Sequence, residues 1–200
     1  MKMLKSAVIA AAMTALFSAT AGAAPVFSDN FDSYPLTLNW AGGGGWTVSN
    51  GTVDLIGNPG FFDFLPGNGR YVDLDGSTAN PGLFSNTVNL TGGVTYTLSF
   101  RLAGSQRGSA ETVDVDFGTA TATFNRNSAD PFTTASVNFT PTTTGSYGFS
   151  FENSGGDNVG ALLDNVEVSA SSVPEPGSYA LMLVAIGIMG AMRRGGQAKD

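Results

Sequence analysis

Short runs of alternating hydrophobic and polar residues recur through the middle of the chain. Every second residue is apolar in Thr95–Leu102, in Val113–Phe117 and in Tyr147–Phe151. A period of two places the apolar side chains on one face of an extended strand. The pattern therefore predicts β-strands with one face in a core and one face in water.

Clusters of Gly, Pro and Asn separate these runs and indicate turns. Within WTVSNGTVDLI, Asn50–Gly51 is a typical hairpin turn, and Gly92–Gly93 interrupts the chain before the next strand. We count about ten short strands, the last over Ala161–Val168, and expect no helix between residues 24 and 172. This arrangement predicts an all-β fold, a jelly-roll-like antiparallel β-sandwich.

The N-terminal segment has the pattern of a secretory signal peptide. Two lysines in the first five residues precede the apolar run AVIAAAMTALFSA at 7–19, and Ala21 and Ala23 form a small-x-small site. We expect signal peptidase to remove residues 1–23 and leave Ala24 as the new first residue. The alternative, an uncleaved membrane helix, is disfavoured because the apolar run is short for a bilayer.

A second apolar segment occupies residues 177–192, between Val173-Pro174-Glu175-Pro176 and Arg193-Arg194. About sixteen apolar residues barely cross a bilayer as a helix, and the arginines hold that end on the cytoplasmic side. The prolines keep the preceding chain extended and open to an enzyme. Residues 173–200 are thus either a temporary membrane address or a permanent single-span anchor, and residues 24–172 form the exported domain.

Composition excludes several chemistries. The chain has no cysteine and no histidine, which rules out disulfides, thiolate nucleophiles, Cys/His zinc sites and a Ser-His-Asp triad. Residues 24–172 contain fourteen acidic residues, four arginines and no lysine, a net charge of −10. Such a domain repels nucleic acid, whose binding depends on Lys and Arg. It is compatible with cations and with neutral or cationic glycans, or the charge serves solubility alone.

One carboxylate falls on a core position. In ALLDNVEV, Asp164 shares its strand face with Leu162 and Val166, so it needs a cation, an arginine or backbone donors. The first and last strands of a sandwich are often neighbours, so Asp32 and Asp164 are candidate ligands of a structural calcium ion, together with backbone carbonyls. The alternative is a strand end or bulge where Asp164 is solvated or hydrogen-bonded.

Aromatic residues in Gly- and Pro-rich stretches are candidate ligand contacts. Trp40 and Trp46 flank a glycine run in NWAGGGGW, and Phe62 lies in GNPGFFDFLPGNG. Rings exposed on loops stack on sugars, whereas buried ones act as lids of the core. Arg101 and Arg107 either bind a ligand or tie down a loop, and the second role is more common for a charge at a strand end.

The C-terminal segment resembles the PEP-CTERM sorting signal of Gram-negative bacteria. The motif V-P-E-P-G-S-Y, the apolar run and the Arg-Arg pair span Val173–Gly196. This resemblance implies recognition by an exosortase in the inner membrane, and a destination at the cell surface or extracellular matrix, linked to exopolysaccharide. The central stretches YVDLDGST, YTLSFRLAGSQRG and LLDNVEV are similar to exported DUF642-like or galactose-binding-like domains. That similarity implies a jelly roll whose relatives include carbohydrate-binding modules.

Two functions from different classes remain. The first is a non-catalytic surface or matrix protein that binds carbohydrate. The second is a small hydrolase that cleaves glycans with two carboxylates at a defined separation. The sequence singles out no such pair among the fourteen acidic residues, so we favour binding.

Overall fold

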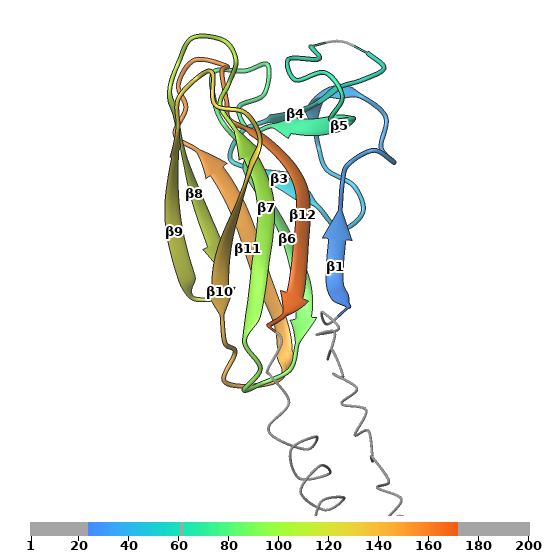
Figure 1. Ribbon diagram of the computed structural model, residues 1–200, viewed down its shortest axis with the longest axis vertical. Coiled ribbons are helices and arrows are strands. Elements are labelled where there is room, and N and C mark those ends of the chain that lie inside the picture. The colour runs from blue at the N-terminus through green and yellow to red at the C-terminus, as the bar shows by residue number, and fades with distance from the viewer. Residues whose placement is uncertain (1–23, 61, 172–200) are drawn as a thin grey trace, which may run out of the picture. The chain divides into compact units, whose positions relative to one another are not determined.

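A computed structural model describes residues 24–60 and 62–171 of the chain, and the fold lies within them (Figure 1). The predicted signal peptide and the predicted C-terminal membrane helix fall outside these residues. None of the described residues is helical, so this part of the chain contains no helix able to cross a membrane.

The described residues form two antiparallel sheets, which confirms the predicted all-β sandwich. One sheet has the order β10-β7-β12-β5-β4-β2, and β1 also pairs with β12. The other has the order β3-β6-β11-β8-β9. The strands of the first sheet are β1 (Pro25–Asp29), β2 (Thr37–Trp40), β4 (Val53–Gly57), β5 (Arg70–Asp73), β7 (Tyr96–Ala103), β10 (Thr133–Phe139) and β12 (Leu162–Ala170). Those of the second are β3 (Thr47–Ser49), β6 (Leu83–Leu90), β8 (Glu111–Phe117), β9 (Ala120–Arg126) and β11 (Gly145–Asn153).

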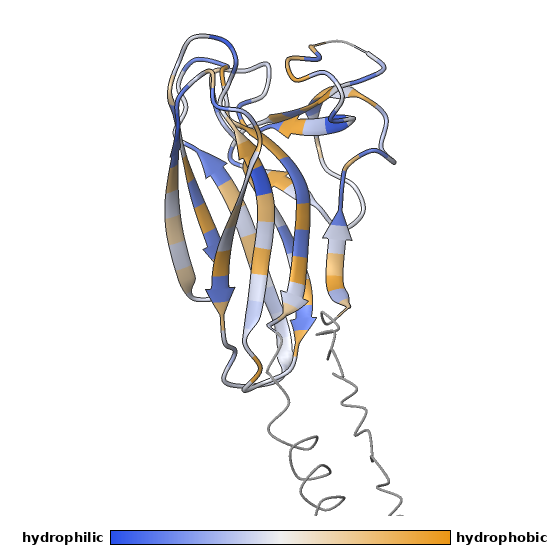
Figure 2. Cartoon of the chain, in the orientation of Figure 1, coloured by the Kyte–Doolittle hydropathy of each residue, from blue (hydrophilic) through white to orange (hydrophobic). Residues whose placement is uncertain are grey.

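The alternating runs place their apolar side chains between the sheets. In β8, Val113, Val115 and Phe117 are fully buried, while Asp114 and Asp116 are exposed. Figure 2 shows the same alternation of hydrophobic and hydrophilic positions along several strands. The predicted strand periodicity is therefore confirmed. The apolar side chains that it turns inward form the main part of the core.

The predicted hairpin at Asn50–Gly51 is wrong. β3 pairs with β6 in one sheet, whereas β4 pairs with β2 and β5 in the other, so the chain crosses between the sheets here. A two-residue type I′ turn needs positive φ at both residues, but only Asn50 has it, at 63°. Gly51 instead packs against the chain at Pro81, where an added Cβ would lie 2.2 Å from the Pro81 carbonyl oxygen.

Strand β12 runs along the first sheet and pairs with three other strands. One of its edges pairs with β7, and the other pairs first with β5 and then with β1. The register between β12 and β7 shifts between Asp164 and Glu167, and Asn165 has a φ of 48°. This irregularity marks the change of partner from β5 to β1. The expectation that the first and last strands are neighbours is confirmed.

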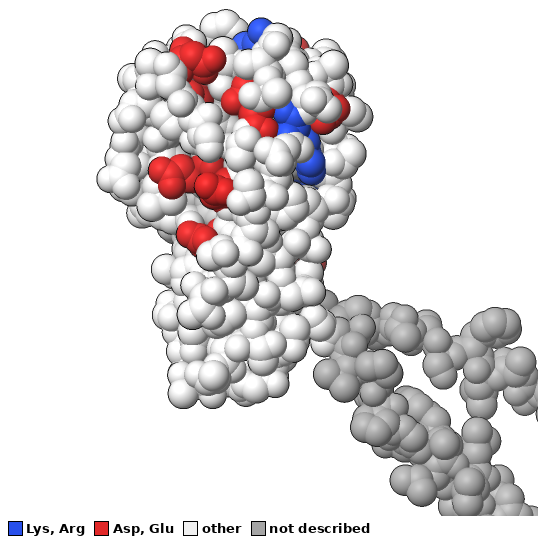
Figure 3. Space-filling model, turned by 90° about the vertical axis from the view of Figure 1, so that its left-hand side faces the viewer, with Lys and Arg blue, Asp and Glu red and all other residues white. Residues whose placement is uncertain are grey.

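The charged residues of the sandwich are predominantly acidic. Figure 3 shows several acidic side chains on the side where β8 and β9 lie. Asp114 of β8 and Glu152 of β11 are cross-strand partners, and both are exposed. Such a surface disfavours contact with polyanions.

Candidate functional site

The loops at one end of the sandwich enclose a small pocket, called the loop-end pocket below. They follow β4, β5, β7 and β11 and gather at the top of Figure 1. The pocket has a volume of about 310 Å³. Its walls combine apolar and polar side chains from these loops and strands: Asp54, Ile56, Phe62, Phe64, Asp73, Ser77, Arg107 and Asn158.

Arg107 ties the loops of this pocket together. Its guanidinium forms an ion pair with Asp73 on β5, and its Nη1 donates to the backbone oxygen of Asn158 at 2.9 Å. The same group lies over the ring of Phe64, 5.2 Å from its centroid. Burial raises the pKa of Asp73 to about 8, although the charge of Arg107 opposes that rise. The loop-binding role expected for Arg107 is confirmed.

Two carboxylates lie side by side in the pocket wall. Asp54 and Asp73 are cross-strand partners in β4 and β5, only 6% and 2% exposed. Asp54 accepts hydrogen bonds from the backbone of Asn39 at 2.6 Å and from the hydroxyl of Ser77 at 2.7 Å. Asp73 accepts from the backbone of Gly160 at 3.1 Å and pairs with Arg107. Because both groups already have protein partners, they position the loops.

An aromatic wall closes one side of the pocket. The rings of Phe62 and Phe64 are stacked, with centroids 6.0 Å apart and planes inclined by 25°. Phe62 is 53% exposed and has a φ of 56°, a conformation that costs energy in a bulky residue. Of the three aromatic residues predicted as ligand contacts, Phe62 therefore lies in a pocket with an accessible ring.

Trp40 and Trp46 do not provide a stacking surface, which corrects that prediction. They are 6% and 3% exposed. Trp46 stacks on Phe84 with centroids 4.1 Å apart, and its indole N–H donates to Asp29 at 2.9 Å. The preceding glycines fold the loop back, with Gly42 at a φ of 97°, and this turn carries the indole into the core. The structure shows the lid arrangement.

The inward position predicted for Asp164 is confirmed, since the residue is 1% exposed. Arg101 lies opposite in β7, with its Nη1 3.2 Å from an Asp164 carboxylate oxygen, and the backbone of Asn165 donates at 2.7 Å. Burial raises the pKa of Asp164 to about 6, and the nearby charge of Asp32 adds to that rise. Asp32 itself accepts from the backbone of Arg70 at 2.8 Å.

The predicted calcium ligands are thus within electrostatic range, but each has protein partners. Among residues 24–60 and 62–171, no group of three or more His, Cys, Asp or Glu side chains is placed to hold a metal ion. Arg101 is the cation that faces Asp164 in this arrangement. Calcium binding by Asp32 and Asp164 stays a prediction.

Sequence reasoning missed the central role of Asp29. Its two carboxylate oxygens accept hydrogen bonds from the hydroxyl of Tyr34, the indole of Trp46 and the backbone of Phe31. Asp29 stands only three residues before Asp32 in SDNFDSYP, and nothing in that spacing distinguishes it. Only the pairing of β1 with β12 shows which of these acids faces the core aromatics.

Comparisons with known proteins found matches to the C-terminal segment and, separately, to the sandwich. Residues 172–195 match the PEP-CTERM protein-sorting motif, including the predicted Val173, Pro174, Glu175, Pro176, Arg193 and Arg194. These residues lie outside the described part of the structure. No curated protein matches the sequence.

Solved structures match the sandwich. The CBM22-1 xylan-binding domain of Paenibacillus barcinonensis Xyn10C is 14% identical and superposes with a TM-score of 0.53 over 78% of this chain and 99% of that one. The tandem CBM22-1-CBM22-2 domain of the same protein is 17% identical, with a TM-score of 0.51 over 81% of this chain and 50% of that one.

A longer Clostridium thermocellum xylanase 10B chain with CBM22-1 and GH10 modules is 18% identical, with a TM-score of 0.49. The match covers 74% of this chain but only 28% of the xylanase chain. Identities this low establish the fold alone. The chain therefore carries a PEP-CTERM protein-sorting motif behind a β-sandwich with the fold of carbohydrate-binding modules.

Proposed function

We propose that this protein is exported, that an exosortase sorts it to the cell surface or extracellular matrix, and that it binds carbohydrate without catalysis. The observation that carries the binding proposal is the loop-end pocket, where the accessible ring of Phe62 adjoins polar groups. The sorting proposal rests on the motif at residues 172–195. The fold supports the binding proposal, because the neighbours with this architecture include a xylan-binding domain.

The chemistry of the loop-end pocket suits a neutral sugar. The apolar face of a pyranose ring stacks on aromatic side chains such as Phe62 and Phe64, while its hydroxyls need polar partners at the edge. Ser77 and Asn158 supply such partners beside the aromatic wall. A volume of about 310 Å³ is at the lower end of ligand pockets, so we expect a terminal sugar unit rather than a long stretch of polymer.

The hydrolase alternative has one structural feature in its favour, the adjacent carboxylates of Asp54 and Asp73. A glycosidase needs one carboxylic acid free to protonate the leaving group and one carboxylate open to water or to the sugar. Here both side chains are almost completely buried, and their oxygens are occupied by Ser77, Gly160 and Arg107. Their arrangement favours a structural role, and the loop-end pocket favours binding over cleavage.

Replacing Phe62 with alanine tests the proposal. We expect Phe62→Ala to weaken binding of a neutral oligosaccharide identified from a glycan panel by roughly 2- to 13-fold, because stacking contributes about 0.5–1.5 kcal/mol. Leu38→Ala is the matched control, since Leu38 is 40% exposed and does not line the pocket. Titration calorimetry measures the affinity, and thermal melting checks the fold of both variants.

Two results would contradict the proposal. Equal losses of affinity in Phe62→Ala and Leu38→Ala would remove the loop-end pocket as the binding site. Release of reducing sugar from the bound oligosaccharide, lost in Asp54→Asn, would instead support the hydrolase.

A further inference from the structure

Asp75 lies two residues after β5 and is completely buried, with 0% of its surface exposed. Its Oδ1 is the one buried carboxylate oxygen in residues 24–60 and 62–171 that has no hydrogen-bond partner. Its Oδ2 accepts a long hydrogen bond of 3.4 Å from the backbone of Asn158. A buried acceptor without a partner costs free energy, and the cost is greatest when the group is charged.

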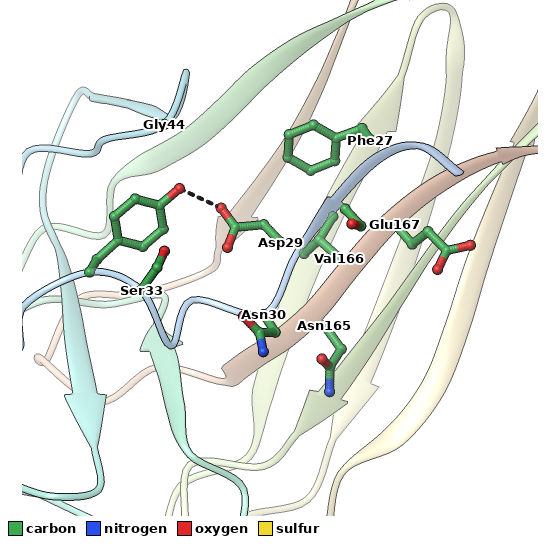
Figure 4. Close-up of a pocket in the computed structure, with 10 residues that line it drawn as sticks. Phe27, Asp29, Asn30, Ser33, Gly44, Asn165, Val166 and Glu167 are labelled. Carbon is green, nitrogen blue, oxygen red and sulfur yellow. Dashed lines mark hydrogen bonds between the residues drawn. The ribbon is translucent and has the colours of Figure 1, made fainter. Parts of the chain in front are cut away.

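The other buried acids of the described residues have a partner for each carboxylate oxygen. These acids are Asp54, Asp73, Glu111 and Asp164. Half-buried Asp29 shows the same pattern. Tyr34 and Trp46 donate to one of its oxygens, as Figure 4 shows for Tyr34, and the backbone of Phe31 donates to the other. The fold therefore surrounds these carboxylates with donors, and Asp75 is the exception.

The neighbouring groups that act on Asp75 are acids. Asp73 precedes it in β5, Glu111 is in β8, and Asp157 lies in the loop between β11 and β12. Arg107, the arginine of the loop-end pocket, is already paired with Asp73. A negative charge on Asp75 would thus be unhydrated at Oδ1 and repelled by its neighbours.

These surroundings favour the neutral acid. Burial raises the pKa of Asp75 above its ordinary value, and the charges of Asp157 and Glu111 add to the rise. Hydrogen bonds from the backbones of Asn158 and Gly156 act in the opposite direction and are outweighed. A protonated carboxyl group leaves an uncharged oxygen unpaired, which costs less than an unpaired charge.

The loop between β11 and β12, residues 154–161, packs against Asp75. An added Cβ at Gly155 would overlap Oδ2 of Asp75, and one at Gly160 would overlap its backbone nitrogen. The N–H of Asn158, in the middle of the loop, donates to Asp75. Asn158 also lines the loop-end pocket. The same loop therefore covers the buried acid and forms part of the pocket wall.

We propose that Asp75 makes the loop-end pocket sensitive to pH: as a neutral acid it keeps the β11–β12 loop closed, and on losing its proton it releases the loop. An ionised Oδ1 needs water, and movement of the covering loop admits it. Because the closed loop favours the protonated form, it is stable in acid and is lost as the pH rises through the midpoint of Asp75. Release moves Asn158 out of the pocket wall, so ligand affinity falls. This effect on affinity rests on the proposed function, whereas the release of the loop does not.

Titration of the wild-type protein tests the protonation state without any substitution. The carboxyl carbon of Asp75, followed by NMR, should titrate well above the ordinary aspartate pKa of about 3.9. Hydrogen exchange of residues 154–161, corrected for its intrinsic pH dependence, should show protection falling above the same midpoint by up to about tenfold per pH unit. A midpoint near the ordinary value, or a loss of protection at a different pH, would overturn the proposal.

Asp75→Asn supplies the isosteric test, because asparagine has the shape of the neutral acid and cannot ionise. Its loop should stay protected across the whole titration. Asp116→Asn removes an exposed acid of β8 and should behave as the wild type does. The comparison is needed because burial raises the pKa of Asp73, which faces Arg107 and Asp54, to about 8. Loss of protection that persists in Asp75→Asn would be assigned to Asp73 and would overturn the proposal.

Affinity measurements separate this proposal from the proposed function. Titration calorimetry with the neutral oligosaccharide should show wild-type binding weakening by up to about tenfold per pH unit above the midpoint, and constant binding by Asp75→Asn. Equal pH dependence in the two proteins would overturn the control of the pocket by Asp75. Absence of oligosaccharide binding at every pH, with the loop released at the midpoint of Asp75, would refute the proposed function and leave the release of the loop standing.

Discussion

Replacing Trp46 with alanine would measure how strongly the aromatic centre holds the two sheets together. The indole is 3% exposed, stacks on Phe84 at 4.1 Å and meets Phe149 edge-on at 5.4 Å. Truncating a large buried aromatic side chain costs about 3–5 kcal/mol through lost transfer energy and an unfilled cavity. We expect Trp46→Ala to lower the free energy of unfolding by that amount.

A second substitution separates packing from hydrogen bonding. Trp46→Phe keeps an aromatic ring between the sheets but removes the N–H that donates to Asp29. A hydrogen bond to a charged group is worth about 1.5–3 kcal/mol, so Trp46→Phe should cost about that much. Asp29 keeps its bonds from Tyr34 and Phe31, and its carboxylate therefore stays paired.

Urea unfolding of residues 24–171, which contain both sheets, is the assay. The midpoint should fall in the order wild type, Trp46→Phe, Trp46→Ala, while the slope with urea stays constant. Phe62→Ala serves as the control for loss of an exposed ring. A loss below about 1 kcal/mol in Trp46→Ala, typical of a surface substitution, would refute the placement of this indole in the core.

Two further predictions concern the metal and the chain ends. If Asp32 and Asp164 bind calcium, EDTA should lower the melting temperature. At a hundredfold calcium excess over the dissociation constant, the bound ion would add about 2.7 kcal/mol to the free energy of unfolding. Asp164→Asn should remove that sensitivity, whereas a melting curve indifferent to EDTA leaves Arg101 as the partner of Asp164. Intact-mass analysis of the native protein should show Ala24 as the first residue and loss of the segment after Val173-Pro174-Glu175-Pro176. Recovery of chains that still contain residues 181–192 would contradict removal of the sorting segment.

The strands were predictable because their signal is local. The alternation in Val113–Phe117 and the inward position of Asp164 follow from a period of two, and both hold in the structure. The turn at Asn50–Gly51 was misjudged because its conformation depends on a distant segment, the chain around Pro81. A favourable turn dipeptide indicates that the chain bends, but the pairing of β3 with β6 decides where it goes.

The candidate sites depended on contacts that sequence spacing does not reveal. Arg107 and Asp73 are 34 residues apart, and the pocket they build requires β5 and β7 to flank β12. Trp46 and Phe62 both occur in Gly-rich stretches, yet one is buried and the other exposed. The difference arises from a hydrogen-bond partner, Asp29, and from the buried hydrophobic cluster in which the indole packs. Neither is visible in the local composition.

The pairing of β1 with β12 also sets how the domain would bear a mechanical load. Pro25 lies beside Ser169, so the chain enters and leaves the sandwich at the same end. The loop-end pocket adjoins the start of β12, and the length of that strand separates the pocket from this end by about 26 Å. A tether joined after Ser171 would pull along the axis of β12. Antiparallel hydrogen bonds run perpendicular to the strands, so those to β7 and β1 would be sheared together rather than unzipped one at a time. A domain held this way would resist flow while its pocket faces away from the attachment point.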